Sequence, residues 1–144
     1  MQTTDFDEIV AMISKEDPRY KKGAYVFIQH ALDFTLKKGA KESPQKPKHV
    51  RGPELLEGIK EYAQEQFGLL AMTVLQEWGI ERCEDFGNIV FNLVDFGLLG
   101  KTEQDCPSDF AGGYDFEEAF VAPYLSQRRL RRWQKKRTQV DSPS

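Results

Sequence analysis

Two histidines and two cysteines are the side chains best suited to bind a metal ion or to act as a nucleophile in this chain of 144 residues. His30 and His49 are distant in sequence from Cys83 and Cys106, and the cysteines are 23 positions apart. Zinc sites usually place paired ligands about two to four residues apart. Acidic neighbours of both cysteines disfavour the thiolate that nucleophilic catalysis needs. We therefore expect no metal, no cofactor and no catalytic cysteine.

Carboxylates and glycines also lack a catalytic arrangement in the sequence. Glu117 and Glu118 are adjacent, but acid–base catalysis needs a carboxyl whose pKa is raised in a cleft, and adjacency does not indicate one. Gly112 and Gly113 are typical of a turn and lack the spaced glycines and lysine of a phosphate loop. The sequence predicts that the protein is not an enzyme.

A basic segment near the C-terminus carries the clearest functional signature. Residues 1–126 hold 13 cationic and 22 acidic side chains, a net charge of −9, whereas residues 127–144 hold seven cations and one acid, a net charge of +6. Arginine and lysine suit phosphate contacts, and tryptophan suits base stacking. The candidate nucleic-acid-binding residues are Arg128, Arg129, Arg131, Arg132, Trp133, Lys135, Lys136 and Arg137.

The same tail is compatible with other partners. It could lie on an anionic membrane, dock on an acidic protein groove, remain solvated, or fold back on the acidic part of its own chain. We predict a non-enzymatic binding module that contacts nucleic acid or another polyanion through the tail. The alternative is a protein-interaction or homodimerisation module that uses the acidic helical body near Phe86, Phe91 and Phe96.

Apolar residues at helical spacing predict the elements that carry this tail. Helices are expected near residues 5–17, 23–39, 53–67, 69–78 and 85–97, and the polar stretch 39–53 is expected to be a loop. Gly79 can adopt the left-handed conformation that ends a helix, with Ile80 packing back on it. In the fifth helix, Phe86, Ile89 and Leu93 are expected in the core, together with Leu75 and Trp78.

Residues 98–116 predict a two-stranded β-hairpin, because apolar residues flank a cluster of turn formers. A buried helix followed by such a hairpin resembles the second half of a winged helix-turn-helix domain. The expected fold is therefore mainly α, with four to five helices and a small β-hairpin, winged-helix-like. One domain is expected over residues 1–126, followed by a basic, flexible tail over 127–144.

The helix at 85–97 would be the reading helix of a winged helix-turn-helix protein. Such a helix offers arginine, lysine, asparagine or glutamine to the bases. Here Asn88 and Asn92 are the suitable groups, while Glu84, Asp85 and Asp95 repel phosphate. A base-reading role for this helix is therefore not expected.

Five phrases in order resemble a family of uncharacterised bacterial proteins: FDEIVAMISKEDPRY, GAYVFIQHAL, ELLEGIKEYAQEQFG, EWGIERCEDFGNIVFNLVDFGLL and GGYDFEEAF. The resemblance runs from about Phe6 to Phe120 and implies no particular activity, ligand or functional residue. The basic tail lies outside it. No segment reaches the roughly 20 apolar residues of a membrane span, and the N-terminus lacks a secretion signal. With few cysteines, the expected setting is the cytoplasm.

Overall fold

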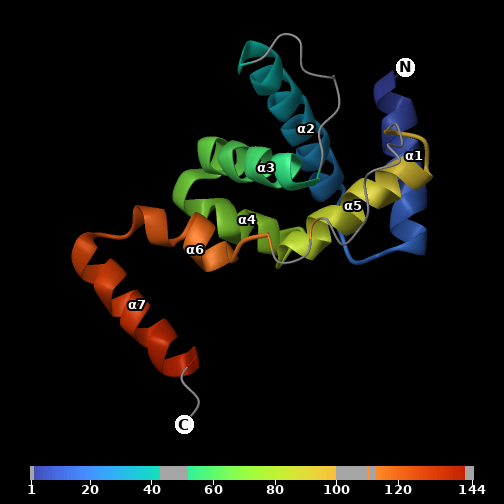
Figure 1. Ribbon diagram of the computed structural model, residues 1–144. Coiled ribbons are helices and arrows are strands. Elements are labelled where there is room, and N and C mark those ends of the chain that lie inside the picture. The colour runs from blue at the N-terminus through green and yellow to red at the C-terminus, as the bar shows by residue number, and fades with distance from the viewer. Residues whose placement is uncertain (1, 43–51, 100–109, 111–112, 142–144) are drawn as a thin grey trace.

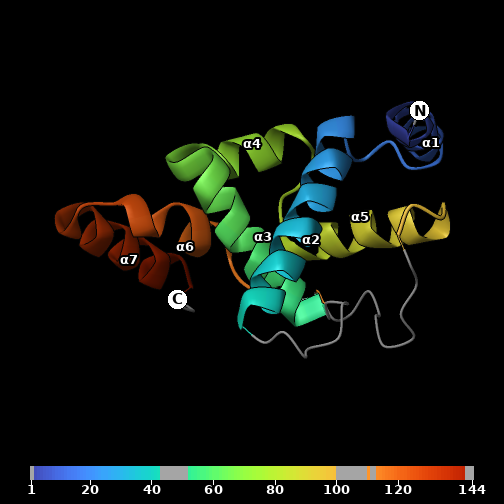
Figure 2. The same cartoon turned by 90° about the horizontal axis from the view of Figure 1, so that it is seen from above.

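The structure, a computed structural model, describes residues 2–42, 52–99, 110 and 113–141, and these are mostly helical. Helices α2 to α5 lie in the middle, with α1 on one side and with α6 and α7 on the opposite side (Figure 1 and Figure 2). Short 3-10 turns follow α3 and α6. The elements are α1 (Gln2–Glu16), α2 (Lys22–Glu42), α3 (Gly52–Phe67), η1 (Gly68–Leu70), α4 (Ala71–Glu77), α5 (Cys83–Asp95), α6 (Phe116–Phe120), η3 (Ala122–Tyr124) and α7 (Gln127–Asp141).

The core is formed around α5, whose apolar residues recur every three or four positions. Phe86, Ile89 and Leu93 are each at most 1% exposed, and Leu75 of α4 is fully buried. These positions confirm the predicted core, although Trp78 is only partly buried. Within the described residues, no helix combines the length and apolar character needed to cross a bilayer.

The turn after α4 has the conformation that the sequence predicts. Gly79 has φ of 92°, in the left-handed region that favours glycine. Its N–H donates to the carbonyl of Gln76 at 3.0 Å, and the N–H of Ile80 donates to that of Leu75 at 2.9 Å. These two bonds form a Schellman motif, which satisfies the last carbonyls of α4. The fully buried Ile80 then leads the chain toward α5.

Helices α2 and α3 approach closely where α3 has a glycine. A Cβ atom added to Gly58 would lie 1.8 Å from Thr35 Oγ1. The Thr35 hydroxyl donates to the Ala31 carbonyl at 2.7 Å, which directs it along its own helix. Lys38 and Glu61 form an ion pair between the same two helices. A side chain at position 58 would therefore separate α2 from α3.

A polar network joins the α1–α2 connection to α5. The Tyr20 hydroxyl donates to Asp85 Oδ1 at 2.6 Å and accepts from Asn88 Nδ2 at 3.0 Å. The second Asp85 oxygen accepts the backbone N–H groups of Glu81 and Arg82, at 2.8 and 3.1 Å. Burial, together with the hydrogen bond to Asp85, raises the pKa of Tyr20 above its usual range. Tyr20 therefore stays a neutral donor at ordinary pH.

A second part of this network is centred on Asp17. Arg19 donates to Asp17 through Nε and Nη2, both at 2.7 Å, and Asn92 Nδ2 donates to it at 2.9 Å. Asn92 also donates to the hydroxyl of the fully buried Tyr25 at 3.1 Å. The Arg19 hydrogen bonds, assisted by that from Asn92 and opposed by burial, hold the pKa of Asp17 well below its usual range.

The predicted β-hairpin near residues 98–116 is wrong, and the helices exceed the four or five expected. Residues 100–109 and 111–112 lie outside the described residues, and the part of the chain that the structure describes contains no strand. Leu98 belongs to the turn that ends α5, where its N–H donates to the Leu93 carbonyl at 2.8 Å. Asp115 caps α6 by accepting from the Glu118 N–H at 3.0 Å. Phe116 and Phe120 are buried one helical turn apart, so helical packing replaces the expected strand.

We predict that Leu93→Ala lowers the free energy of unfolding by about 2–5 kcal/mol, because the truncation leaves a cavity in the core. Urea denaturation measures this change. Leu69→Ala is the matched control, since Leu69 is 59% exposed and should change stability by less than about 0.5 kcal/mol. Equal effects of the two substitutions would contradict the assignment of the core.

We predict that Asp17→Asn lowers stability at neutral pH by about 1–2 kcal/mol, because hydrogen bonds to a charged group are lost. A depressed pKa makes this contribution full above the ordinary aspartate pKa of about 4 and progressively smaller as the pH falls toward the folded-state pKa. Unfolding measured from neutral to acidic pH should show the variant and the wild type converging in acid. A constant difference across this range would count against the carboxylate's role.

Candidate nucleic-acid interface

The predicted basic tail forms helix α7. The Ser126 hydroxyl oxygen accepts the N–H of Arg129 at 3.2 Å, and the Ser126 carbonyl accepts that of Leu130 at 2.8 Å. Ser126 is therefore the N-cap, a position at which serine is strongly preferred. Gln127 and the arginines and lysines that follow are good helix formers, so propensity and capping agree. The candidate residues thus lie on a helix, which fixes the side of it that each one occupies.

One side of α7, here called the inner face, contacts α6. It consists of Leu130, Trp133 and Arg137, which are spaced three and four residues apart and are partly buried. Trp133 Nε1 donates to Glu117 Oε2 at 3.2 Å, and Arg137 Nη1 pairs with Asp115 Oδ2 at 2.6 Å. The Arg137 guanidinium lies 4.8 Å from the Trp133 ring centroid, a cation–π distance. These contacts set the rotation of α7 about its axis.

Asp115 forms hydrogen bonds with residues of both α6 and α7. It caps α6 through the Glu118 N–H and also accepts the hydrogen bond from Arg137. Burial raises the pKa of Asp115, but the hydrogen bonds from Glu118 and Arg137 outweigh it, and the net pKa is lowered. Because the pair is partly solvated, it contributes modestly to stability. Its main effect is to determine which residues of α7 face α6.

The opposite side of α7 carries six cations, and we call it the outward face. It consists of Arg128, Arg129, Arg131, Arg132, Lys135 and Lys136, all of which are exposed. With respect to the described residues, none of these six side chains takes part in an ion pair. In Figure 1, α7 projects away from the helices that form the core. The helix therefore presents a concentrated positive surface to solvent.

The structure divides the eight predicted residues into two groups. Six share the outward face, whereas Trp133 and Arg137 contact the acids of α6. Sequence reasoning missed Asp115 and Glu117 as the partners of the tail. These acids follow the turn formers of the expected hairpin, so their place at the start of a helix was not recognised. Only the periodicity of Leu130, Trp133 and Arg137 signals that one side of α7 would be covered.

The two asparagines of α5 donate hydrogen bonds to other residues of the protein. Asn88 donates to Tyr20, and Asn92 donates to Asp17 and Tyr25. Phe86 of the same helix is fully buried, and Phe91 and Phe96 pack partly buried against the core. The two asparagines therefore do not form a base-reading surface, and Phe86 contributes nothing to an exposed aromatic surface.

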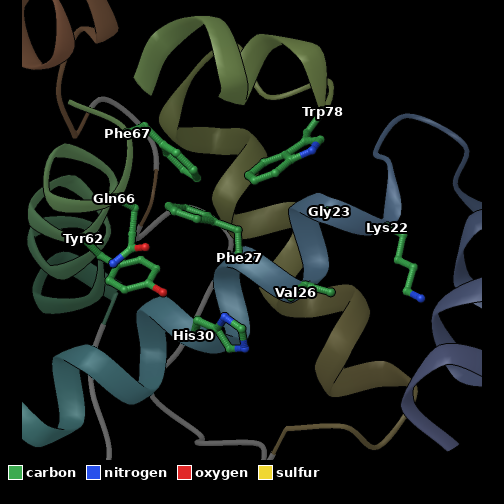
Figure 3. Close-up of a pocket in the computed structure, with 9 residues that line it drawn as sticks. All are labelled: Lys22, Gly23, Val26, Phe27, His30, Tyr62, Gln66, Phe67 and Trp78. Atoms are coloured by element: carbon green, nitrogen blue, oxygen red, sulfur yellow. The ribbon is translucent and has the colours of Figure 1, made fainter. Parts of the chain in front are cut away.

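An aromatic groove of about 340 Å³ lies between α2, α3 and the end of α4. Figure 3 shows Phe27, Tyr62, Phe67 and Trp78 around it, with His30 near its edge. Phe27 contacts the other three rings at centroid distances of 5.5–5.8 Å. A Cβ atom on Gly23 would lie 2.3 Å from Trp78 Nε1, so this glycine permits the indole to pack on α2. Such a groove can accept a small apolar group.

The histidines, cysteines and acids that the structure describes form no metal-binding cluster. Across residues 2–42, 52–99, 110 and 113–141, no group of three or more histidine, cysteine or acidic side chains is placed to hold a metal ion. His49 and Cys106 lie outside these ranges. Cys83 is a buried free thiol whose Sγ lies 3.4 Å from the Tyr114 carbonyl, to which it donates. Burial raises the pKa of Cys83 to about 11, which disfavours the nucleophilic thiolate.

Comparisons of the chain with protein-family models, with curated proteins and with solved structures returned no match.

We predict that Cys83 in a Cys106→Ser background reacts with a disulfide reagent at pH 8 only when the protein unfolds. Burial and the raised pKa both withhold the thiolate from the reagent. The absorbance of released thiolate, followed in native buffer and in urea, measures the reaction. Rapid stoichiometric labelling of the native variant would contradict a structural role for this thiol.

Proposed function

We propose that the protein is a non-enzymatic module that binds nucleic acid through the outward face of α7. The observation that supports this function is the set of six exposed cations on a helix whose other side is attached to α6. Fixing the helix before binding reduces the conformational entropy lost on binding. Each phosphate contact releases condensed counterions, which is the main source of affinity for sequence-independent binding.

The acidic charge of the rest of the chain limits this interface to α7. Residues 1–126 carry a net charge of −9, so their approach to phosphate is unfavourable. Arg137 and Trp133 contact Asp115 and Glu117, the acids that lie directly beneath α7. The proposal therefore places the nucleic acid against one helix, with the acidic helices held away from it.

The arrangement of α7 favours nucleic acid over a membrane surface. A helix that lies on a bilayer inserts an apolar face between the lipid headgroups. In α7 the apolar side chains Leu130 and Trp133 lie on the inner face, toward α6, whereas the outward face is entirely cationic. On a bilayer, α7 would therefore present its charged face to the headgroups and would have no apolar surface on that side to insert.

Association with a protein partner or a second copy through the helical body is the alternative. The aromatic groove between α2 and α3 is the observation in its favour, because three of its rings, those of Tyr62, Phe67 and Trp78, are only partly covered. An interface of this kind depends on apolar contact and responds weakly to salt. Nucleic-acid binding through α7 depends on charge, so salt distinguishes the two.

We predict that the affinity for nonspecific duplex DNA falls with added salt, with a log–log slope of about −5 if all six outward cations contact phosphates. Arg128→Gln, Arg132→Gln and Lys135→Gln in combination should make the slope shallower by about 3. The control is Lys15→Gln, Lys21→Gln and Lys37→Gln, which removes the same charge from α1, α2 and the connection between them. Fluorescence anisotropy with labelled DNA measures both slopes.

Equal slopes for the two triple variants would contradict binding through α7. Binding that hardly responds to salt would favour the apolar interface of the helical body. Because all six substituted side chains are exposed, both variants should fold, which circular dichroism checks.

A further inference from the structure

We infer that, given the nucleic-acid binding proposed above, the partner that fits α7 is B-form duplex DNA, with the helix lying in the major groove. The outward face and the restraint on Trp133 disfavour a single strand, the diameter of α7 favours the B-form major groove, and the projection of α7 from the core permits the approach. The inference concerns the shape of the partner, whereas the proposed function requires only that it be a nucleic acid.

The outward face covers a wide part of the helix circumference. At about 100° per residue, its six positions span an arc of about 160°, over a length of about 12 Å. The two ends of this arc, Arg131 and Arg129, point to nearly opposite sides of the helix. A single strand offers one row of phosphates and can meet only part of such an arc. A groove with phosphates along both walls can meet all of it.

Trp133 is not free to act as a stacking platform for single strands. Its Nε1 donates to Glu117, and the Arg137 guanidinium covers one face of its ring at 4.8 Å. Recognition of single strands relies on aromatic faces on which bases stack. Stacking on the face of Trp133 that Arg137 covers would displace Arg137, which pairs with Asp115. The restraint on this ring therefore disfavours single strands as the partner of α7.

The dimensions of α7 match one groove in particular. An α-helix with its side chains is about 10–12 Å across, and the major groove of B-form DNA is about 12 Å wide. The major groove of an A-form RNA duplex is deep and narrow and does not admit side chains in this way. On duplex RNA, α7 could only lie across the outer surface and would contact fewer phosphates.

The position of α7 in the molecule permits this approach. In Figure 1, α7 extends away from α1 to α5, and in Figure 2 it lies beside α6 at the edge of the molecule. The helices of the acidic body are therefore displaced from the side on which DNA would lie. Contacts between the inner face and α6 keep the outward cations turned toward the side from which the major groove of DNA would approach.

The experiment compares the affinity of the full-length protein for duplex DNA, duplex RNA and single-stranded DNA of equal length at the same salt concentration. At about 0.1 M salt each phosphate contact contributes up to about eightfold in affinity, so losing one contact should weaken binding to duplex RNA by up to about eightfold and losing two by up to about sixtyfold. Charge density alone predicts the opposite order, because phosphates are packed at least as densely along an A-form duplex.

Competing molecules that occupy a known groove test the position of the helix. Methyl green, a major-groove binder, should displace the protein from duplex DNA, whereas distamycin, a minor-groove binder, should not. Equal or tighter binding to duplex RNA or to single strands, or displacement by distamycin alone, would overturn the inference. If the α7 triple variant still bound all three nucleic acids as the wild type does, the proposed function itself would fail.

Discussion

The left-handed turn at Gly79 is the constraint on which the arrangement of the helices depends. It ends α4, buries Ile80 and aims the chain into α5, the helix around which the core forms. A Cβ atom at this position would lie 2.2 Å from the Arg19 carbonyl oxygen, and the Lys21 N–H donates to the Trp78 carbonyl at 3.1 Å. Two connections 60 residues apart in sequence thus meet with no room for a side chain. The Tyr20–Asp85 and Asp17–Asn92 contacts are assembled around this meeting point.

Local patterns in the sequence were sufficient to identify most of the helices. The spacing of Phe86, Ile89 and Leu93 predicted a buried face, and Gly79 predicted a stop, because each of these signals arises within one or two helical turns. The hairpin prediction failed at Tyr114 and Phe116, where aromatic residues and nearby glycines suit either a strand or the start of a helix. Asp115 decides in favour of a helix through its cap, and Phe120 packs with Phe116 one turn later.

The candidate interface was predictable in composition and not in arrangement. The concentration of charge in residues 128–137 is visible in the sequence, because it needs no knowledge of the fold. The separate roles of Trp133 and Arg137 depend on Asp115 and Glu117, which lie 16 to 22 positions away and are brought to them by the fold of α6 and η3. In the same way, Asn88 and Asn92 belong to internal hydrogen bonds because distant Tyr20, Asp17 and Tyr25 lie against α5.

In α7, the residues that attach the helix to the fold and the residues that give its surface a positive charge lie on different faces. Leu130, Trp133 and Arg137 lie on the face of α7 that contacts α6, so changes at these positions would disturb that contact. The outward cations make no ion pair with the described residues and can therefore change without disturbing the core. Mutation can therefore add or remove outward charge in single steps, each tolerated by the fold. A lineage carrying this helix could change the positive charge of its outward face gradually, and could abolish it, while keeping the same helical body.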